Sequence, residues 1–559
     1  MTAAFTFNAR VAEDAISRVS RLFNASLDDI FAELFQNARR AGAKQIAVSQ
    51  ISYPNMGEVL CVIDNGPGIA DPEHLFTLGQ SAWQDELQSS EDAAGMGFFA
   101  LAGRRVRIIA QEAGTDRSWM IDTEPDSFAG KSPITCKPGP AHHDGMTVLI
   151  EAKPNEPFVS AANHAAKYLP LEVVVDGVVA ERRDFLAKAD HVEDWRGIRI
   201  GLFETSPTVF RHDGNVNFHG VTLQAALPHV TQSFHRAYYA QLDVRHCAEL
   251  KLVLPARKEV VADAFFAELK QQILRIIFER IAAAGAHTLP YPSWSKARAM
   301  GVDLPEATPM LRPFSARHAD HNCNDLNPPT ALRPDDLLLD SDDSPIDEQN
   351  LAMALSATED APRLFEPNGS FNGYSWYDTL PCLALSGYRL EHVESIERVP
   401  LGETPLTHER PAKAYIEGEI GTVTDLIPWQ LETDALILGE DYGHIDEADF
   451  CVPIGAEITH DDLIDLVKRA LFNPSDDVEA GSYDEQERWF LDEAEDRIIA
   501  LLQSQHEMNV NAVIRTISRE LYWLCKPAND VTIRIVEGQI TVDGIESGDI
   551  SATLTEAST

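Results

Sequence analysis

Glu33 and Asn37 form a pair suited to metal-assisted chemistry. They stand four residues apart, so a helix through this stretch places both side chains on one face, one turn from each other. The amide oxygen of Asn37 is a hard ligand of the kind that Mg²⁺ binds while it keeps several waters. The carboxylate of Glu33 can position and deprotonate an attacking water. Alone, the pair is more typical of the polar face of an ordinary amphipathic helix.

A further carboxylate stands where an apolar run ends. Asp64 follows the run 59–63 and opens the turn-forming cluster Asp64-Asn-Gly66-Pro-Gly68. In that position its oxygens can accept a hydrogen bond from an amino group, such as N6 of adenine. Gly66 and Gly68 let the backbone approach a planar base closely and tolerate positive φ. The same residue types also form ordinary turns after buried strands.

Two weaker signals lie downstream. Gly95 and Gly97 precede a predicted helix, and uncovered backbone N–H groups at a helix start bind phosphate. The pattern is neither the P-loop nor the dinucleotide-binding fingerprint, whose third glycine is absent. Thr147 adds a hydroxyl to the β-rich run 145–150, where threonine is usually present as a good strand former.

Sequence periodicity predicts the elements that position these groups. Residues 11–42 are predicted to be helical, with Ser26 as the N-cap of the part that carries Glu33 and Gly42 just after its end. A second helix is predicted at 97–104. Apolar runs predict strands at 45–51, 59–63, 105–111, 117–122 and 146–152. This order of elements predicts an α+β layer sandwich.

Taken together, three boxes in the first hundred residues resemble the ATP site of the GHKL superfamily. They are Glu33-Leu-Phe-Gln-Asn37-Ala, Asp64-Asn-Gly66-Pro-Gly68-Ile69 and Gly95-Met96-Gly97-Phe98-Phe. This superfamily covers DNA gyrase, the ninety-kilodalton heat-shock chaperones, histidine kinases and MutL, and the third box is most similar to that of the chaperones. The resemblance implies a Bergerat-type α/β sandwich that binds ATP with Mg²⁺.

The resemblance also implies a role for each matching residue. Glu33 would be the general base, Asn37 the Mg²⁺ ligand, and Asp64 the residue that recognises adenine. Thr147 would support Asp64 through a water, and the glycine-rich box would close over the phosphates. The other nucleotide contacts expected from the boxes are Gly66, Gly68, Ile69, Gly95, Met96, Gly97 and Phe98.

The segment between the second and third boxes is expected to form a mobile lid. Leu78-Gly-Gln-Ser81 occupies the usual lid position, from which Ser81 could reach a phosphate. The chain departs from the family at Asp92-Ala-Ala94, where an additional glycine is common. We therefore expect the flexibility of this lid to differ from that of the family.

A second resemblance lies at 254–261. Leu254-Pro-Ala-Arg257-Lys258-Glu-Val-Val261 precedes a long helix predicted at 262–283, and looks like the strand-loop-helix that lends a basic residue to the γ-phosphate in the chaperones and related ATPases. A cation there would stabilise charge on the transferred phosphoryl group. Lys258 is the first candidate and Arg257 the second. A solvated Arg-Lys pair before a helix is the alternative.

A chain of 559 residues is too long for a single core. We expect an ATP-binding domain at 1–155, an α+β transducer-like middle domain at 156–285 and a mixed α/β C-terminal domain at 366–559. Residues 286–365 are expected to be a Pro/Asp-rich linker. Prolines recur there, and residues 331–350 contain seven acidic residues and one arginine, a composition that resists compact packing.

Further elements are predicted in the later domains. The middle domain is expected to start with a hairpin centred on Asp176-Gly177 and to contain strands at 216–223 and 250–254. In the C-terminal domain, the sequence predicts a capped helix from Thr459, helices at 482–502 and 510–524, and a closing hairpin around Glu537-Gly538.

Charge and cysteine usage limit the class of protein. The formal net charge is 46 − 88 = −42, which disfavours broad binding to nucleic acid or to anionic membranes. Seven scattered cysteines without a CxxC pair fit a reducing cytosol better than a disulfide framework or a zinc knuckle. We find neither a signal-peptide pattern nor a run of ~20 apolar residues. We therefore expect a soluble, cytoplasmic protein.

The combined expectation is an ATP hydrolase whose nucleotide cycle drives a conformational switch in a chaperone-like or partner-remodelling role. Its partners would be ATP and an unidentified protein client. A helix at 484–502 could form a homodimer, but its apolar residues are more typical of a core. One alternative is a non-hydrolysing ATP-sensing scaffold. Another is a GHKL-type protein kinase, which is disfavoured because the 32 residues before Glu33 are too few for an upstream phosphoacceptor hairpin.

Overall fold

The chain forms two compact units, residues 1–308 and 309–559. In the computed structural model, both units contain helices and β-sheets, so the α+β class predicted from the sequence is confirmed for the described part of the chain. The structure describes residues 26–77, 97–128, 130–140, 143–206, 214–233, 236–253, 259–323, 327–340, 344–407, 409–422, 425–439, 445, 448–477, 480–502, 532–536 and 539–543.

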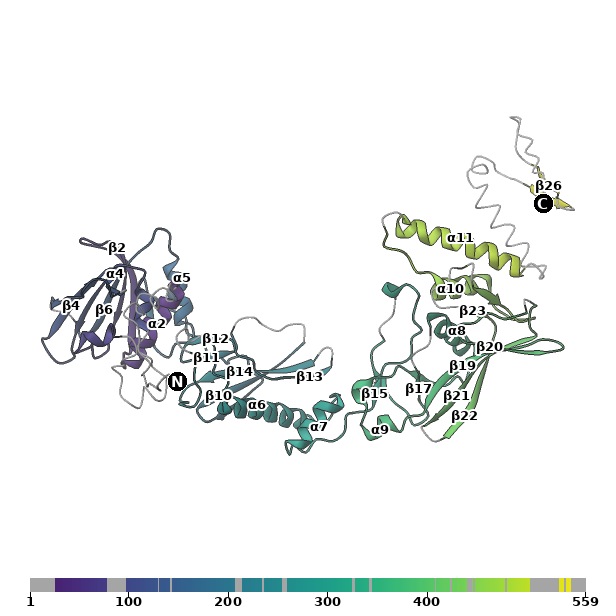
Figure 1. The fold of residues 1–559 in the computed structure, drawn as a ribbon, viewed down its shortest axis with the longest axis horizontal. Helices are drawn as coiled ribbons and strands as arrows, with labels where there is room; N and C mark the ends of the chain where they lie inside the picture. Colours follow the sequence, from purple (N-terminus) through teal and green to yellow (C-terminus); the bar gives the residue numbers. More distant parts are fainter. Residues whose placement is uncertain are drawn as a thin grey trace, which may run out of the picture. The chain divides into compact units, whose positions relative to one another are not determined.

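The first unit begins with an eight-stranded sheet of order β5-β4-β3-β6-β2-β1-β7-β8. Neighbouring strands are antiparallel, except that β1 and β7 are parallel. Helices α2 (Leu27–Arg40) and α5 (Phe158–Ala166) share one apolar core with a face of this sheet (Figure 1). The strands are β1 (Gln45–Tyr53), β2 (Gly57–Asp64), β3 (Val106–Gln111), β4 (Ser118–Thr123), β5 (Cys136–Pro138), β6 (Gly145–Glu151), β7 (Glu172–Val175) and β8 (Val178–Val179).

Helix α2 forms where capping and periodicity predict it. The Ser26 hydroxyl accepts a hydrogen bond from the Asp29 N–H, and the Asp29 carboxylate accepts from the Ser26 N–H, so the two residues form a capping box. Gly42 follows the helix with a φ of +80°, as expected for the residue that ends it. The apolar stripe is buried against the sheet and comprises Leu27, Ile30, Phe31, Leu34, Phe35 and Ala38. The helix predicted over 11–25 lies outside the described residues.

The strands predicted in the first 155 residues are all present, but the helix predicted at 97–104 is wrong. In its place are the 3₁₀ segment η2 (Gly97–Leu101) and a turn. The N–H groups of Ala102 and Arg104 donate three residues back, to Phe99 and Leu101, which is the spacing of the tighter 3₁₀ turn. Two other short helices in this region are η1 (Pro72–Leu75) and α4 (Pro125–Phe128).

The first sheet extends past residue 155, where we expected its domain to end. The hairpin centred on Asp176-Gly177 is confirmed, with φ values of 49° and 79°, but its strands β7 and β8 join the first sheet. Val173 and Val175 are buried in the same core as α5, so burial draws this hairpin to the N-terminal sheet.

The first unit also contains a six-stranded sheet with the path β12-β11-β14-β10-β9, and β13 pairs with β14. The single strand predicted at 216–223 is wrong. His219 and Gly220 have φ values of 55° and 106°, which reverses the chain and divides the segment into a hairpin. The strands are β9 (His191–Trp195), β10 (Ile198–Thr205), β11 (Val216–Phe218), β12 (Val221–Leu223), β13 (His229–Ser233) and β14 (Arg236–Val244).

The long helix predicted at 262–283 is confirmed as α6 (Ala264–Ala283). The Asp263 side chain accepts a hydrogen bond from the Phe266 N–H at 2.9 Å and caps the helix. Its apolar side chains are buried in one core with the second sheet. The strand predicted at 250–254 is, in the described part, an isolated bridge between Leu252 and Val260.

Residues 286–365 are folded structure, contrary to the linker that we expected. Prolines do not prevent packing here, because Pro292 and Pro345 occupy the first turns of α7 and α8, where a missing N–H costs nothing. The boundary between the two units lies within this stretch. Its elements are α7 (Tyr291–Ala299), β15 (Met310–Leu311), η4 (His321–Cys323), β16 (Thr330–Ala331), β17 (Leu337–Leu339), α8 (Pro345–Ser356) and β18 (Leu364–Phe365).

Several acidic side chains of this stretch are paired within the fold. Asp336 and Glu348 are buried, and lie 3.1 Å from Arg363 and 2.7 Å from Arg317, respectively. Asp347 forms a capping box at the start of α8. A composition that predicts a solvated spacer is thus compatible with a packed unit, because the charges are matched by arginines that are distant in the sequence.

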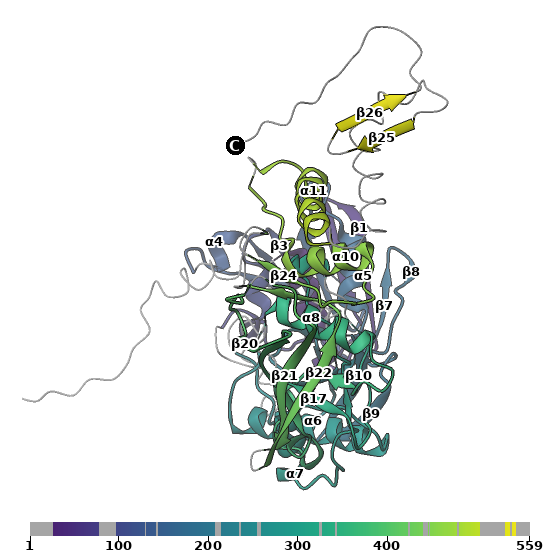
Figure 2. The same ribbon diagram turned by 90° about the vertical axis from the view of Figure 1, so that its right-hand side faces the viewer.

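The second unit is built on a sheet with the path β18-β17-β19-β21-β22, and β20 pairs with β19. Helix α10 contacts both α8 and α11, and Figure 2 shows it between them. The remaining elements are η5 (Gly369–Phe371), α9 (Ser375–Asp378), β19 (Cys382–Glu391), β20 (Ile396–Pro400), β21 (Lys413–Thr422), β22 (Asp425–Thr433), β23 (Leu436–Leu438), β24 (Asp449–Cys451), α10 (His460–Leu471), α11 (Tyr483–Leu502), β25 (Thr532–Val536) and β26 (Gln539–Asp543).

Three C-terminal predictions are confirmed. Thr459 caps α10, a helix covers 483–502, and β25 pairs with β26. The helix predicted at 510–524 lies outside the described residues. Within the described parts of the chain, no helix is both long and apolar enough to cross a membrane.

Candidate functional site

Helix α2 carries Glu33 and Asn37 one turn apart, and both side chains are half-buried. Asn37 Oδ1 lies 3.5 Å from Nη1 of the buried Arg40, almost one turn further along the helix. The candidate Mg²⁺ ligand therefore has a guanidinium beside it. Such a charge favours an anionic ligand near this turn.

Asp64 ends β2 and is buried, with 8% of its surface exposed. Its Oδ1 accepts a hydrogen bond from the Gly66 N–H at 2.9 Å, and the Met146 N–H also donates to the carboxylate. Burial raises the pKa of Asp64 above that of an ordinary aspartate, and these N–H groups and nearby His143 partly oppose the shift. A further hydrogen-bond donor, such as the amino group of a base, would stabilise the ionised form of a buried carboxylate of this kind.

The two glycines of the second box are required by the packing of their own loop. A Cβ at Gly66 would lie 2.9 Å from Asp64 Oδ1 and 3.5 Å from the Cβ of Ala41, just after α2. Gly68 has a φ of +72°, and a Cβ there would lie 2.1 Å from the Gln111 carbonyl oxygen. The glycines thus let the loop pack between the end of α2 and β3, which brings Asp64 close to the end of the helix that carries Asn37.

Ile69 and Phe98 also contribute to this packing. The Ile69 carbonyl accepts a hydrogen bond from Trp119 Nε1 at 2.7 Å, and its side chain packs on the core. Phe98, which follows Gly97 in η2, is buried with its ring edge-on to Phe76 at 5.7 Å. Both residues therefore support the loops around the candidate site from within the core.

Thr147 lies in β6, but the structure does not bring its side chain to Asp64. The pairing of β6 with β2 sets Met146 opposite Asp64 and Thr147 opposite Ile63. Opposite residues share a face and successive residues alternate, so Thr147 points to the other face of the sheet. Its hydroxyl lies 3.3 Å from His143 Nε2. The support for Asp64 that the resemblance assigns to Thr147 comes here from the Met146 backbone.

Five predicted site residues lie outside the described residues: Ser81, Gly95, Met96, Arg257 and Lys258. The described flanks of the last two pair with each other, because the Val253 N–H donates to the Glu259 carbonyl at 2.8 Å. Val253 and Glu259 therefore lie beside each other ahead of α6.

Gln36 is a residue of this region that sequence reasoning did not select. It precedes Asn37 and is buried, and its side-chain amide donates to the carbonyl of His219, in the turn between β11 and β12. Its partner is 183 positions away, and no local pattern indicates such a contact.

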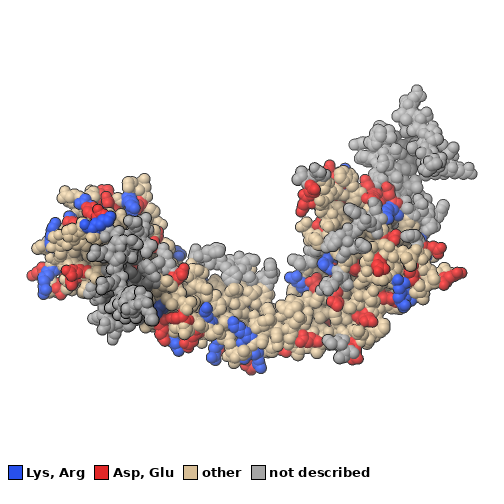
Figure 3. All heavy atoms as spheres, viewed as in Figure 1, with Lys and Arg blue, Asp and Glu red and all other residues tan. Residues whose placement is uncertain are grey.

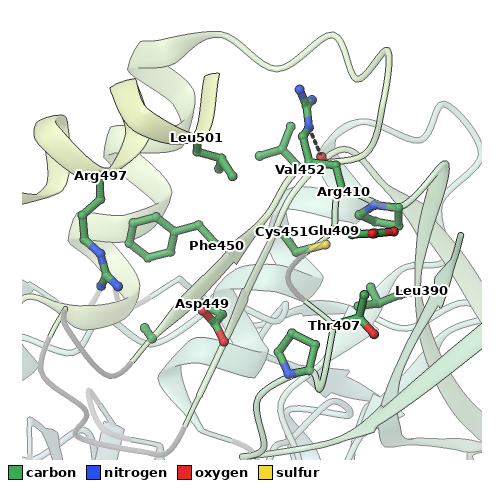
Figure 4. A pocket seen from close by; sticks show the side chains of 13 residues that line it. Leu390, Thr407, Glu409, Arg410, Asp449, Phe450, Cys451, Val452, Arg497 and Leu501 are labelled. Atoms are coloured by element: carbon green, nitrogen blue, oxygen red, sulfur yellow. Dashed lines mark hydrogen bonds between the residues drawn. The ribbon is translucent and has the colours of Figure 1, made fainter. Parts of the chain in front are cut away.

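A separate cavity of about 240 Å³ lies in the second unit (Figure 4). Arg410 at its edge donates from Nε to the Val452 carbonyl at 3.0 Å, and the Arg497 guanidinium lies 5.3 Å from the ring of Phe450. Burial raises the pKa of the Cys451 thiol to about 12, so this thiol stays protonated and is a poor nucleophile. Both arginines of this cavity therefore contact neighbouring groups of the fold.

Among the described residues, no group of three or more His, Cys, Asp or Glu side chains is placed to hold a metal ion. The candidate oxygen ligands on α2 are the amide of Asn37 and the carboxylate of Glu33. This set suits Mg²⁺, which binds through few protein ligands and completes its shell with water and substrate phosphates.

No model of a known protein family matches the chain, and no curated protein sequence matches it. The functional interpretation therefore depends on the residues and their geometry.

Proposed function

We propose that this protein binds ATP with Mg²⁺ and hydrolyses it in the manner of the GHKL superfamily. The observation that carries the proposal is a buried carboxylate, Asp64, whose loop packs against the end of the helix bearing Glu33 and Asn37. The first sheet with α2 and α5 would then be a Bergerat-type sandwich. The second sheet with α6 would be its transducer-like partner.

Asp64 would bind the adenine end of the nucleotide. Its carboxylate already accepts from two backbone N–H groups, and the N6 amino group of adenine would supply a further donor to the ionised form. Because Gly66 and Gly68 have no side chain, their backbone would let a planar base approach closely.

Glu33 and Asn37 would act at the phosphate end. Mg²⁺ would offset negative charge on the phosphate oxygens, and Asn37 would give it one oxygen ligand. Glu33 would position the attacking water and accept its proton. Lys258, or else Arg257, would face the γ-phosphate from the segment that precedes α6.

The surface favours a protein partner over a polyanion. Asp and Glu side chains are spread over the visible face of both units, and Lys and Arg occur in small groups among them (Figure 3). With a net charge of −42, such a surface repels a phosphate backbone. We therefore propose a chaperone-like or partner-remodelling role in the cytoplasm, where the free cysteines of the described residues would remain reduced.

The proposal is tested by equilibrium binding of ATP and Mg²⁺ to the full chain and to Asp64→Asn. The variant exchanges an acceptor oxygen for an amide group that can oppose the amino group of adenine, so we expect binding to weaken about 100-fold or more. Asp176→Asn is the matched control, because Asp176 also lies after a strand of this sheet but is exposed in a turn that asparagine accepts. Equal affinity of Asp64→Asn and the parent would contradict the proposal.

A further inference from the structure

Gln36 links the helix that bears Glu33 and Asn37 to the second sheet of the same unit. It is 5% exposed, and its Nε2 donates to the His219 carbonyl at 2.5 Å. Its Oε1 accepts from Arg39 Nε at 3.1 Å. With a carbonyl on one side and a guanidinium on the other, the amide has a single orientation that satisfies both ends.

The turn that accepts this bond, His219-Gly220 between β11 and β12, has little freedom to move. Both residues have positive φ. A Cβ at Gly220 would lie 3.0 Å from the Leu169 Cα and 3.4 Å from Gln36 Nε2. The turn is therefore seated against α2 and against the residues that follow α5, at a distance that only glycine allows.

Asn217 connects this turn to the middle of the second sheet. It is 4% exposed, its Oδ1 accepts from the Gly220 N–H at 2.9 Å, and its Nδ2 donates to Asp243 Oδ1 at 2.7 Å. Asp243 lies in β14 and also pairs with Arg199 of β10 at 3.2 Å. Polar contacts that are shielded from water are stronger than exposed ones and fix the groups that they join.

We propose that Gln36 is a positioning residue for ATP hydrolysis, and that Asn217 acts through it. The inference rests on the proposed function. A small shift of the turn at His219 would change the seating of α2, and with it the placement of Glu33 and Asn37 relative to the water and the phosphates. The second sheet thereby sets the rate of turnover without touching the nucleotide.

The test compares two asparagines of one hairpin in the full chain. Asn217→Ala frees the turn that Gln36 binds. Asn215→Ala is the matched control, since it removes similar bonds to the Ala225 backbone, at 2.8 and 2.7 Å, on the far side of β12. We expect kcat of Asn217→Ala to fall about tenfold, with the dissociation constant for ATP within about twofold of the parent. Asn215→Ala should keep the kcat of the parent.

Gln36→Met is the second arm, because it preserves side-chain volume while removing the donor to His219. We expect the same fall of about tenfold in kcat. The double variant with Asn217→Ala should be no slower than either single variant, because both changes break one path. Thermal unfolding identifies any variant that does not fold. If Asn217→Ala does not fold, the kcat of Gln36→Met alone tests the inference.

The outcomes separate the inference from the function on which it rests. A parent that fails to bind or to hydrolyse ATP would overturn the proposed function, and this inference with it. An active parent whose kcat is unchanged in Gln36→Met would overturn the inference alone. A loss of ATP affinity with unchanged kcat would also overturn it, because it would assign Gln36 a merely structural role.

Discussion

The candidate site and the second unit contain buried acidic residues whose partners differ. In the second unit, Asp336 and Glu348 each have an arginine within 3.1 Å. In the candidate site, Asp64 is also buried, but the hydrogen bonds described for its carboxylate come from backbone N–H groups, and burial raises its pKa. Arginines offset the charge of the paired acids, whereas in our proposal the Asp64 carboxylate accepts a hydrogen bond from the nucleotide.

The difference shows that the structural role of an acidic residue depends on the groups that contact it. The acidic stretch 331–350 predicted a solvated spacer, and its arginine partners Arg317 and Arg363 lie outside it. The Asp-x-Gly-x-Gly box, in contrast, contains its own partner, the Gly66 N–H. A local motif is therefore safer to interpret than a local composition.

The largest effect on stability is expected from a substitution that destabilises the second unit without changing ATP binding by the first. Asn350 is fully buried, and its side chain bonds with both the N–H and the carbonyl of Ile437, at 2.9 and 2.7 Å. Asn350→Ala leaves these groups unpaired, and each costs about 1–3 kcal/mol, so we expect the second unit to lose about 3 kcal/mol of unfolding free energy. Denaturant unfolding measures this loss, and ATP affinity should stay unchanged.

Asn163→Ala is the control for this experiment. Asn163 is exposed on α5 and bonds only a carbonyl of its own helix in the described contacts, so its removal should cost less than about 0.5 kcal/mol. If Asn350→Ala weakened ATP binding as much as it weakened the second unit, the two units would not be energetically separate.

A smaller effect is expected in the pH dependence of the first unit. Because burial raises the pKa of Asp64, its contribution to stability is fully present below the ordinary aspartate pKa and is lost as the pH rises through the raised value. From about pH 4 to about pH 8, the stability of nucleotide-free Asp64→Asn should therefore improve relative to the parent. Thermal unfolding of both proteins across this range measures the trend, and parallel profiles would contradict it.

Much of the site's framework follows from local sequence. The capping box at Ser26 and the apolar stripe define α2, and the turn cluster at Asp64 marks the end of β2. Local sequence does not show which residue of β6 contacts Asp64. A shift of one position along the strand moves a side chain to the other face of the sheet, and Thr147 lies one position away from Met146, which pairs with Asp64.

Long-range contacts account for the other differences. Strands β7 and β8 join the first sheet because β7 pairs in parallel with β1. This pairing sets Gln45 opposite Glu172, more than 120 positions later in the sequence. The contact between Gln36 and His219 is of the same kind. Such contacts depend on how the elements meet, which periodicity within one element does not encode.

Steady-state ATP hydrolysis by the full chain and by Glu33→Ala tests the central claim most directly. Glu58→Ala serves as control, since Glu58 is an exposed glutamate in β2 of the same unit. The account predicts turnover by the parent and the control, a loss of at least about 100-fold in Glu33→Ala, and retained ATP binding. Equal turnover by Glu33→Ala and the parent would contradict the assignment of Glu33 as general base, and tight binding without turnover in the parent would favour an ATP sensor or a kinase.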